Sequence, residues 1–252
     1  MLSRIRVNSH IKERDTGLMR KVKIICMLCA AIFPLLVSGA GYAHAEAHRY
    51  VAVYLDAHYG GRDRGPVIGK KVLGKDVTVV LAKAIQRELM NFNIKAFLSR
   101  DEDIFIPLGD RWFHAKKKGA DIYLSLRLRF QDKDCVQIYT AKRRAYDDKT
   151  AKQSGREKAA PASADEDRAR ESSRLAVLLS KNIRDADRSL SSIVASKKDI
   201  IFETADFPTV IAEFGIARTA QQHSYILEQA MIDSIAKSVA TALKEFIEGP
   251  QN

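Results

Sequence analysis

The sequence predicts a single α/β domain with a mostly parallel, mixed sheet and helices on both faces. Short apolar segments of strand length alternate with longer segments whose apolar residues recur every three or four positions. This alternation is typical of parallel strands joined by crossover helices. The chain has 252 residues, enough for one domain with a substantial core, and its 46% hydrophobic content argues against wholesale disorder.

The predicted elements follow one another from residue 50 onward. Strands are expected where apolar residues alternate or cluster over a few positions, and helices where they form one face. The predicted strands are 50–56, 94–99, 122–126, 136–139 and 209–214. The predicted helices are 76–91, 108–118, one that begins near Ser172, and 224–247. A glycine-rich loop is expected at 58–69, between the first strand and the first helix.

The first 45 residues are typical of a secretory signal peptide. Arg20, Lys21 and Lys23 precede a short apolar run at 24–37, and Ala43 and Ala45 supply the small residues that a signal peptidase requires. The run falls short of the roughly 20 apolar residues of a membrane-spanning helix. Because Met19 directly precedes the basic cluster, we predict that it is the true start. The alternative is an uncleaved membrane anchor.

Cleavage would leave a domain at 46–248 that is exported to the periplasm or the cell surface. Without the first 45 residues, 35 basic and 29 acidic residues remain, a net charge of +6. This mild excess suits an anionic wall or membrane surface, and no motif indicates a nucleic-acid partner. Cys135 is then the only cysteine, which excludes an intrachain disulfide. Residues 141–172 are rich in charged and small residues, and we predict a solvated insertion there.

Several short motifs occur in the same order as in a known family of enzymes. They are 56–61 (D-A-H-Y-G-G), 74–77 (G-K-D-V), 99–103 (S-R-D-E-D) followed by Leu108 and Arg111, 120–121 (A-D) followed by 125–127 (S-L-R), and Pro208 followed by 212–215 (A-E-F-G). They resemble D-P-G-H-G-G, E-K-D-V, T-R-D-x-D with L-x-x-R, A-D with S-I-H, and P-x-x-L-V-E-x-G-F of the zinc-dependent N-acetylmuramoyl-L-alanine amidases. Those enzymes cut the bond between the glycan sugar and the stem peptide of peptidoglycan.

The resemblance also implies where a zinc ion and its ligands belong. In that family the first histidine, the glutamate of E-K-D-V and the histidine of S-I-H hold zinc, and the last glutamate handles the proton of the attacking water. The matching positions here are Tyr59, Gly74, Arg127 and Glu213. A phenol, a glycine and a guanidinium are poor zinc ligands. We therefore expect no metal cofactor, and Glu213 is the one catalytic position retained.

Three further residues are candidates for binding at this site. We predict that Arg127 pairs with Glu213 or Asp56, so that its guanidinium replaces the positive charge of the metal. The alternative is that Arg127 and Arg129 project into solvent as a basic rim. His58 stands one residue before the expected zinc position, where it would serve in a rebuilt metal site or as a hydrogen-bonding loop residue. Glu213 also has a simple structural interpretation, as a residue near a strand end.

The leading hypothesis for function is an exported, catalytically inactive amidase-like protein. It would bind peptidoglycan or regulate a cell-wall hydrolase as its partner, and it would meet a membrane only through an uncleaved N-terminal segment. One alternative is an active N-acetylmuramoyl-L-alanine amidase with an atypical site. Another is a basic surface protein that binds anionic polymers or lipids through residues 116–118 and the insertion.

Overall fold

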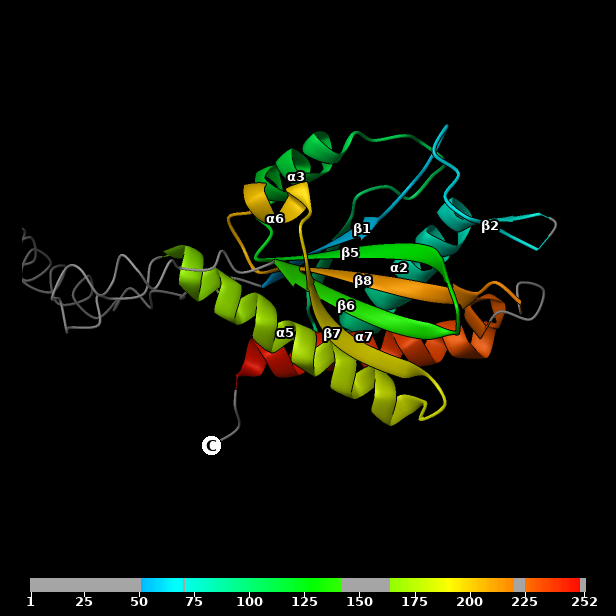
Figure 1. Ribbon diagram of the computed structural model, residues 1–252. Coiled ribbons are helices and arrows are strands. Elements are labelled where there is room, and N and C mark those ends of the chain that lie inside the picture. Colours follow the sequence, from blue (N-terminus) through cyan, green and yellow to red (C-terminus); the bar gives the residue numbers. More distant parts are fainter. Residues whose placement is uncertain (1–50, 70, 142–163, 220–224, 250–252) are drawn as a thin grey trace, which may run out of the picture. The chain divides into compact units, whose positions relative to one another are not determined.

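A six-stranded sheet forms the centre of the computed structural model, which describes residues 51–69, 71–141, 164–219 and 225–249. The strands are β1 (Ala52–Ala57), β4 (Lys95–Leu98), β5 (Ile122–Gln131), β6 (Cys135–Ala141), β7 (Ser191–Lys197) and β8 (Thr209–Ala217). Their order is β4-β1-β5-β8-β6-β7. Strands β4, β1, β5 and β8 run parallel, β6 is antiparallel to β8, and β7 is parallel to β6. The predicted mostly parallel, mixed sheet is confirmed (Figure 1).

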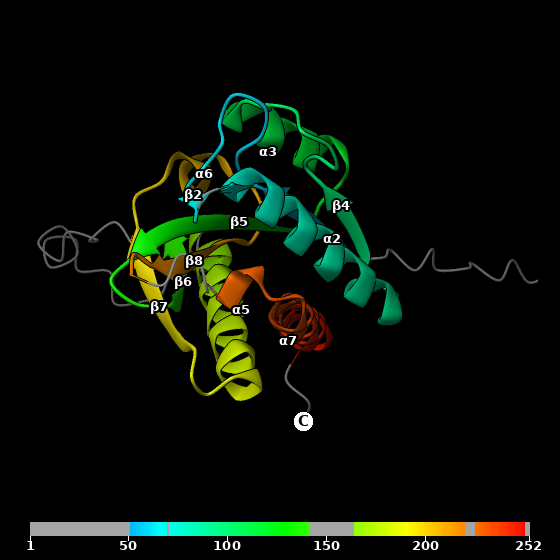
Figure 2. The ribbon, with the colours of Figure 1, turned by 90° about the vertical axis from the view of Figure 1, so that its right-hand side faces the viewer.

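Helices cover both faces of the sheet, as predicted (Figure 2). One face carries α2 (Gly74–Asn91), α5 (Ala164–Ala186) and α7 (Gln229–Glu248), which share the larger hydrophobic cluster. The other face carries the shorter α3 (Leu108–Lys117) and α6 (Ile200–Thr204), which pack over a smaller cluster. A two-stranded ribbon of β2 (Val67–Ile68) and β3 (Val72–Leu73) leads into α2, and the short helix η2 (Tyr225–Leu227) precedes α7.

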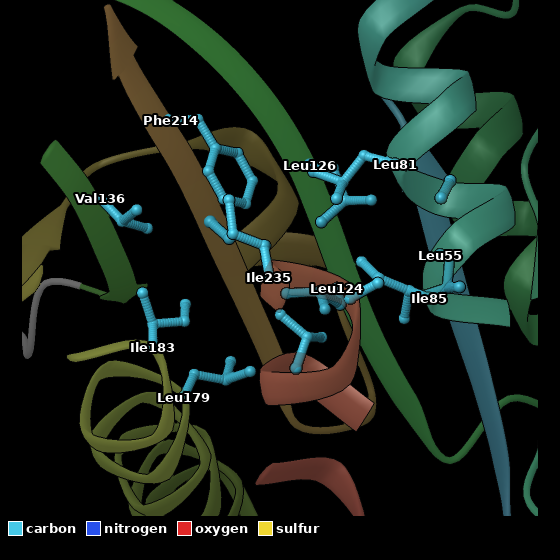
Figure 3. Packing of buried hydrophobic residues seen from close by; sticks show 14 of the residues in the cluster. Leu55, Leu81, Ile85, Leu124, Leu126, Val136, Leu179, Ile183, Phe214 and Ile235 are labelled. Atoms are coloured by element: carbon cyan, nitrogen blue, oxygen red, sulfur yellow. The ribbon is translucent and has the colours of Figure 1, made fainter. Parts of the chain in front are cut away.

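Alternate side chains of β5 enter the layers on opposite faces of the sheet. Leu124 and Leu126 are fully buried and point toward α2 and α7, where they meet residues such as Ile85 and Ile235 (Figure 3). Tyr123 and Ser125 alternate with these leucines along the strand and therefore face the opposite layer. Each fully buried aliphatic side chain contributes about 1.5–3 kcal/mol through the hydrophobic effect. The larger cluster thus holds the sheet rigid and leaves the opposite face free to carry polar groups.

Some predicted boundaries are wrong. Helix α5 begins at Ala164 rather than near Ser172, so the end of the predicted insertion is helical, although it is exposed or half-buried up to Glu171. Ser172 is buried, and its Oγ accepts a hydrogen bond from the Thr209 amide at 3.0 Å. Strand β7 and helix α6 were not predicted. The rest of the insertion and the predicted signal peptide lie outside the described residues. Within the part of the chain that is described, no helix has the length and apolar character needed to span a membrane.

Candidate functional site

Polar side chains gather on the α3 and α6 side of three adjacent strands. Asp56 of β1 is in register with Ser125 of β5, and Arg127 of β5 is in register with Glu213 of β8. Residues in register on parallel strands project to the same face, so all four share one surface of the sheet. Each of them is less than 10% exposed. The sheet therefore brings together three of the predicted site residues, Asp56, Arg127 and Glu213.

Asp56 is the centre of a buried ion-pair network. Its Oδ1 lies 2.9 Å from Nη1 of Arg111, and its Oδ2 accepts a hydrogen bond from Ser125 Oγ at 2.9 Å. His58 Nδ1 lies 3.6 Å from Oδ2 and 3.3 Å from the same Arg111 nitrogen. Burial alone would raise the pKa of Asp56, but His58, the charge of Arg111 and the Ser125 hydroxyl hold that pKa well below its usual range. His58 thus lies beside Asp56.

Arg127 does not pair with either of the predicted acids. Its Nη1 lies 2.6 Å from Oδ2 of Asp199, the residue that caps the N-terminus of α6, and its Nε donates to Ser125 Oγ at 3.2 Å. The predicted pairing is wrong because Asp199 enters from a segment for which no structure was predicted. Burial would raise the pKa of Asp199, yet its bond to Arg127 lowers it. Arg127 is 8% exposed, so it is no part of a solvated rim, whereas the Arg129 side chain is 63% exposed.

Glu213 is buried, and its cationic partners are Lys197 and Arg129 instead of Arg127. Its Oε2 lies 3.2 Å from Lys197 Nζ at the end of β7, and its Oε1 lies 3.9 Å from Nη1 of Arg129. The side chain is 5% exposed, and Oε1 has no hydrogen-bond partner among the residues described. Two cations therefore balance this buried carboxylate.

Tyr59 stands at the first zinc position of the amidase motif, and its hydroxyl bonds to the protein backbone. Its hydroxyl donates to the Leu128 carbonyl at 2.5 Å. Burial raises the pKa of Tyr59 to about 12, so the phenol stays protonated near neutral pH. The backbone here adopts positive φ at Tyr59 (70°) and Gly60 (122°), and a Cβ at Gly60 would lie 2.1 Å from the Ile104 carbonyl. This turn therefore requires glycine at position 60.

The role of Arg100 was not predicted from the sequence: its side chain holds the turn after β1 through hydrogen bonds to backbone carbonyls. Arg100 is 4% exposed and donates hydrogen bonds to five backbone carbonyls. Their residues are Ala57, His58, Tyr59, Lys75 and Glu102. The signal was present, because Arg100 and Arg111 both belong to motifs of the amidase resemblance. Ser125, Asp199 and Lys197 were also missed as partners in the site, and the latter two lie in the segment where no element was predicted.

Gly74, at the second zinc position, lies against the ribbon that precedes α2. Its amide donates to the Pro66 carbonyl at 2.8 Å, and a Cβ on it would lie 2.7 Å from Cδ of Pro66. A side chain at this position therefore forces the ribbon to move. Together, Tyr59, Gly74 and Arg127 offer none of the imidazole, thiolate or carboxylate donors that zinc takes, so these positions do not fit the ion. In the described ranges, no three histidine, cysteine or acidic side chains cluster as metal ligands.

We expect the substitution Gly74→Ala to lower the free energy of unfolding by about 1–3 kcal/mol, because the added methyl group overpacks the contact with Pro66. Denaturant unfolding followed by circular dichroism measures this loss. Gly109→Ala is the matched control: a Cβ there meets nothing within 4 Å, and alanine favours the helix in which it lies. A Gly74→Ala protein as stable as the parent would contradict the close packing described here.

The arrangement matches a family of known proteins. Residues 53–245 match the sequence profile described as N-acetylmuramoyl-L-alanine amidase. The chain belongs to this amidase family. It is 35% identical over 94 residues to N-acetylmuramoyl-L-alanine amidase AmiC of Escherichia coli O6:H1, covering 37% of this chain and 22% of that protein. It is 40% identical over 74 residues to AmiA of Escherichia coli K12, covering 29% of this chain and 26% of that protein. The chain thus matches about a quarter of the length of these relatives.

Solved amidase structures share the fold. The amidase AmiC2 of Nostoc punctiforme superposes with a TM-score of 0.62 at 16% identity, covering 79% of this chain and 98% of that chain. The catalytic domain of CwlV, an amidase from Bacillus (Paenibacillus) polymyxa var. colistinus, gives a TM-score of 0.59 at 16% identity, with the same coverage of 79% and 98%. The predicted amidase-like α/β fold is therefore confirmed.

Proposed function

We propose that this member of the amidase family is an exported cell-wall protein that binds peptidoglycan without cleaving it by zinc catalysis. The observation that carries the proposal is the state of the three motif positions. Tyr59 bonds to the Leu128 carbonyl, Gly74 has no side chain and lies against Pro66, and Arg127 is paired with Asp199. A guanidinium thus stands where the family places a ligand of a divalent cation.

The loss of zinc removes most of the chemistry needed to hydrolyse an amide. A bound zinc ion lowers the pKa of its water from about 15.7 to about 7 and polarises the carbonyl under attack. Glu213 alone would act on ordinary water, and its Oε2 is paired with Lys197 Nζ at 3.2 Å. Its buried Oε1 lies 3.9 Å from Nη1 of Arg129, so the carboxylate as a whole has the surroundings of a paired structural group.

Peptidoglycan is the ligand that the family favours, since the relatives are named for the bond between N-acetylmuramic acid and L-alanine. Export is supported by the N-terminal pattern of a basic cluster, an apolar run and small residues before position 46. A net charge of +6 after that segment suits the anionic wall. Regulation of a cell-wall hydrolase is compatible with the same location.

The decisive experiment is digestion of purified peptidoglycan by the full chain with and without added zinc, read by mass spectrometry. We expect no release of stem peptides, no stoichiometric zinc in the protein and retention on sacculi in a pull-down. Release that zinc stimulates and that Glu213→Ala abolishes would establish the alternative of an active amidase. Sacculus binding that disappears at moderate salt, with equal binding to unrelated anionic polymers, would favour the basic surface protein.

A further inference from the structure

A second candidate site lies at the open edge of the sheet, on the side of β4 that faces away from β1. A groove of about 540 Å³ runs there between β4 and the neighbouring helix α2. Its walls include Lys83, Gln86 and Arg87 of α2 and Ala96 and Leu98 of β4. Strand β4 is the last strand of the sheet on this side among the residues that the structure describes. Neither the zinc positions nor Glu213 line the groove.

The backbone of β4 presents hydrogen-bonding groups to this groove. The Ser99 amide donates to the Leu55 carbonyl of β1 at 2.9 Å, so the backbone of Ser99 faces β1. Successive residues of a strand direct their N–H and C=O groups to opposite sides, and Ala96 and Leu98 therefore direct theirs away from β1. The Ala96 carbonyl accepts a hydrogen bond from Gln86 Nε2 at 2.9 Å, as this alternation requires. An edge of this kind is a template for another strand.

The charge around the groove selects the partner. Lys83 and Arg87 are exposed one helical turn apart on α2, and Lys95 is exposed at the start of β4. Lys83 Nζ donates to the backbone carbonyl of Asp101, which fixes a cation at the rim. Asp101 is the one acidic residue among the groove walls. The cationic side chains therefore attract carboxylates, while the amide and carbonyl groups of β4 can bond to the backbone of a partner.

We propose that this groove binds an extended acidic peptide by strand addition to β4. The peptide backbone pairs with the outward amide of Ala96 and the outward groups of Leu98, while the Ala96 carbonyl keeps its bond to Gln86. The carboxylates of the peptide lie beside Lys83 and Arg87. In strand addition, backbone hydrogen bonds supply affinity and alternate side chains supply specificity. The alternative is that Lys95, at the start of β4, only prevents aggregation at this strand edge, and in that case the groove would bind no peptide.

The proposal is tested by fluorescence anisotropy with the full chain and a labelled peptide of alternating glutamate and valine. Two derivatives carry N-methyl groups on all valines or on all glutamates. Because one set of amides faces β4 and the other faces away, we expect one derivative to lose binding and the other to keep it. Equal binding by both derivatives, or no binding by the parent peptide, would overturn strand addition.

A charge-reversal pair tests the rim. We expect Lys83→Glu with Arg87→Glu to weaken binding by roughly tenfold or more, because rim charges govern attraction of the partner. The matched control is Arg184→Glu with Arg188→Glu, an equal charge change at two exposed positions, one in the last turn of α5 and one just after it. Helix α5 packs against β6 and β7 instead of β4. Equal weakening of peptide binding by both pairs of substitutions would show a general attraction to anions in place of the proposed site. The same conclusion would follow if inorganic polyphosphate displaced the peptide from the parent and the control variant while the Lys83→Glu, Arg87→Glu variant still bound the peptide as well as the parent.

Discussion

Replacement of Arg111 by methionine is expected to lower the free energy of unfolding by about 3–5 kcal/mol at neutral pH. Asp56 has no exposed surface, and Arg111 Nη1 at 2.9 Å supplies its ion pair. Methionine fills much of the same volume but leaves a buried carboxylate without its counter-charge. It also removes the donors to the Ile106 and Tyr59 carbonyls. Denaturant unfolding monitored by circular dichroism and by tryptophan fluorescence measures the loss.

The double variant Asp56→Asn with Arg111→Met is the control for this prediction. Removing both charges takes away the penalty of an unpaired buried ion, so much of the lost free energy returns. If the double variant were less stable than the single one by the full cost of a second substitution, the two residues would be acting independently. That result would contradict the central place of their ion pair in the site.

The pH dependence of the free energy of unfolding tests the same prediction in a second way. The folded pKa of Asp56 lies below the ordinary aspartate value of 3.8, so the paired carboxylate contributes stability that is present above about pH 4 and is lost as pH falls further. Without Arg111, only His58 and the Ser125 hydroxyl oppose the effect of burial, so the pKa of Asp56 rises. The difference in stability between parent and Arg111→Met should therefore narrow on acidification from pH 7 to pH 4. A constant difference over that range would assign the loss to packing alone.

The central strands were predictable because burial leaves a strong pattern. β1, β5 and β8 are covered by helices on both faces, so their apolar residues form runs that sequence alone identifies. β7 is an edge strand in which Ile193 and Val194 are both exposed, and its serines break any alternation. α6 has only five residues, too few for a helical period to appear.

The errors in the site follow from those missing elements. The amidase resemblance implied that Asp56, Arg127 and Glu213 lie near one another, and the register of β1, β5 and β8 places them on one face of the sheet. Their partners were not predictable, because Lys197 and Asp199 come from the segment around β7 and α6. Charge balance at a buried site depends on which chain segment passes within about 4 Å. Local sequence patterns contain no information on that distance.

Arg100 shows a second limit of prediction from sequence, and its replacement is expected to have a large effect on stability. A motif resemblance can mark an arginine, yet only the path of the turn after β1 shows why five carbonyls point at one guanidinium. Each buried carbonyl that loses its donor costs about 1–3 kcal/mol, partly recovered when water enters. We therefore expect Arg100→Ala to lower the free energy of unfolding by at least about 4 kcal/mol, measured by denaturant unfolding.

The companion variants separate geometry from charge. Arg100→Lys keeps the positive charge but offers three donors from a single atom in place of a planar fork, so it cannot reach carbonyls of Ala57, Lys75 and Glu102 together. We expect it to recover less than half of the loss, while Arg184→Ala on exposed α5 surface leaves stability unchanged. Full rescue by lysine would mean that a point charge alone holds the turn. The fork of Arg100 would then have no part in fixing Tyr59 at positive φ beneath the Leu128 carbonyl.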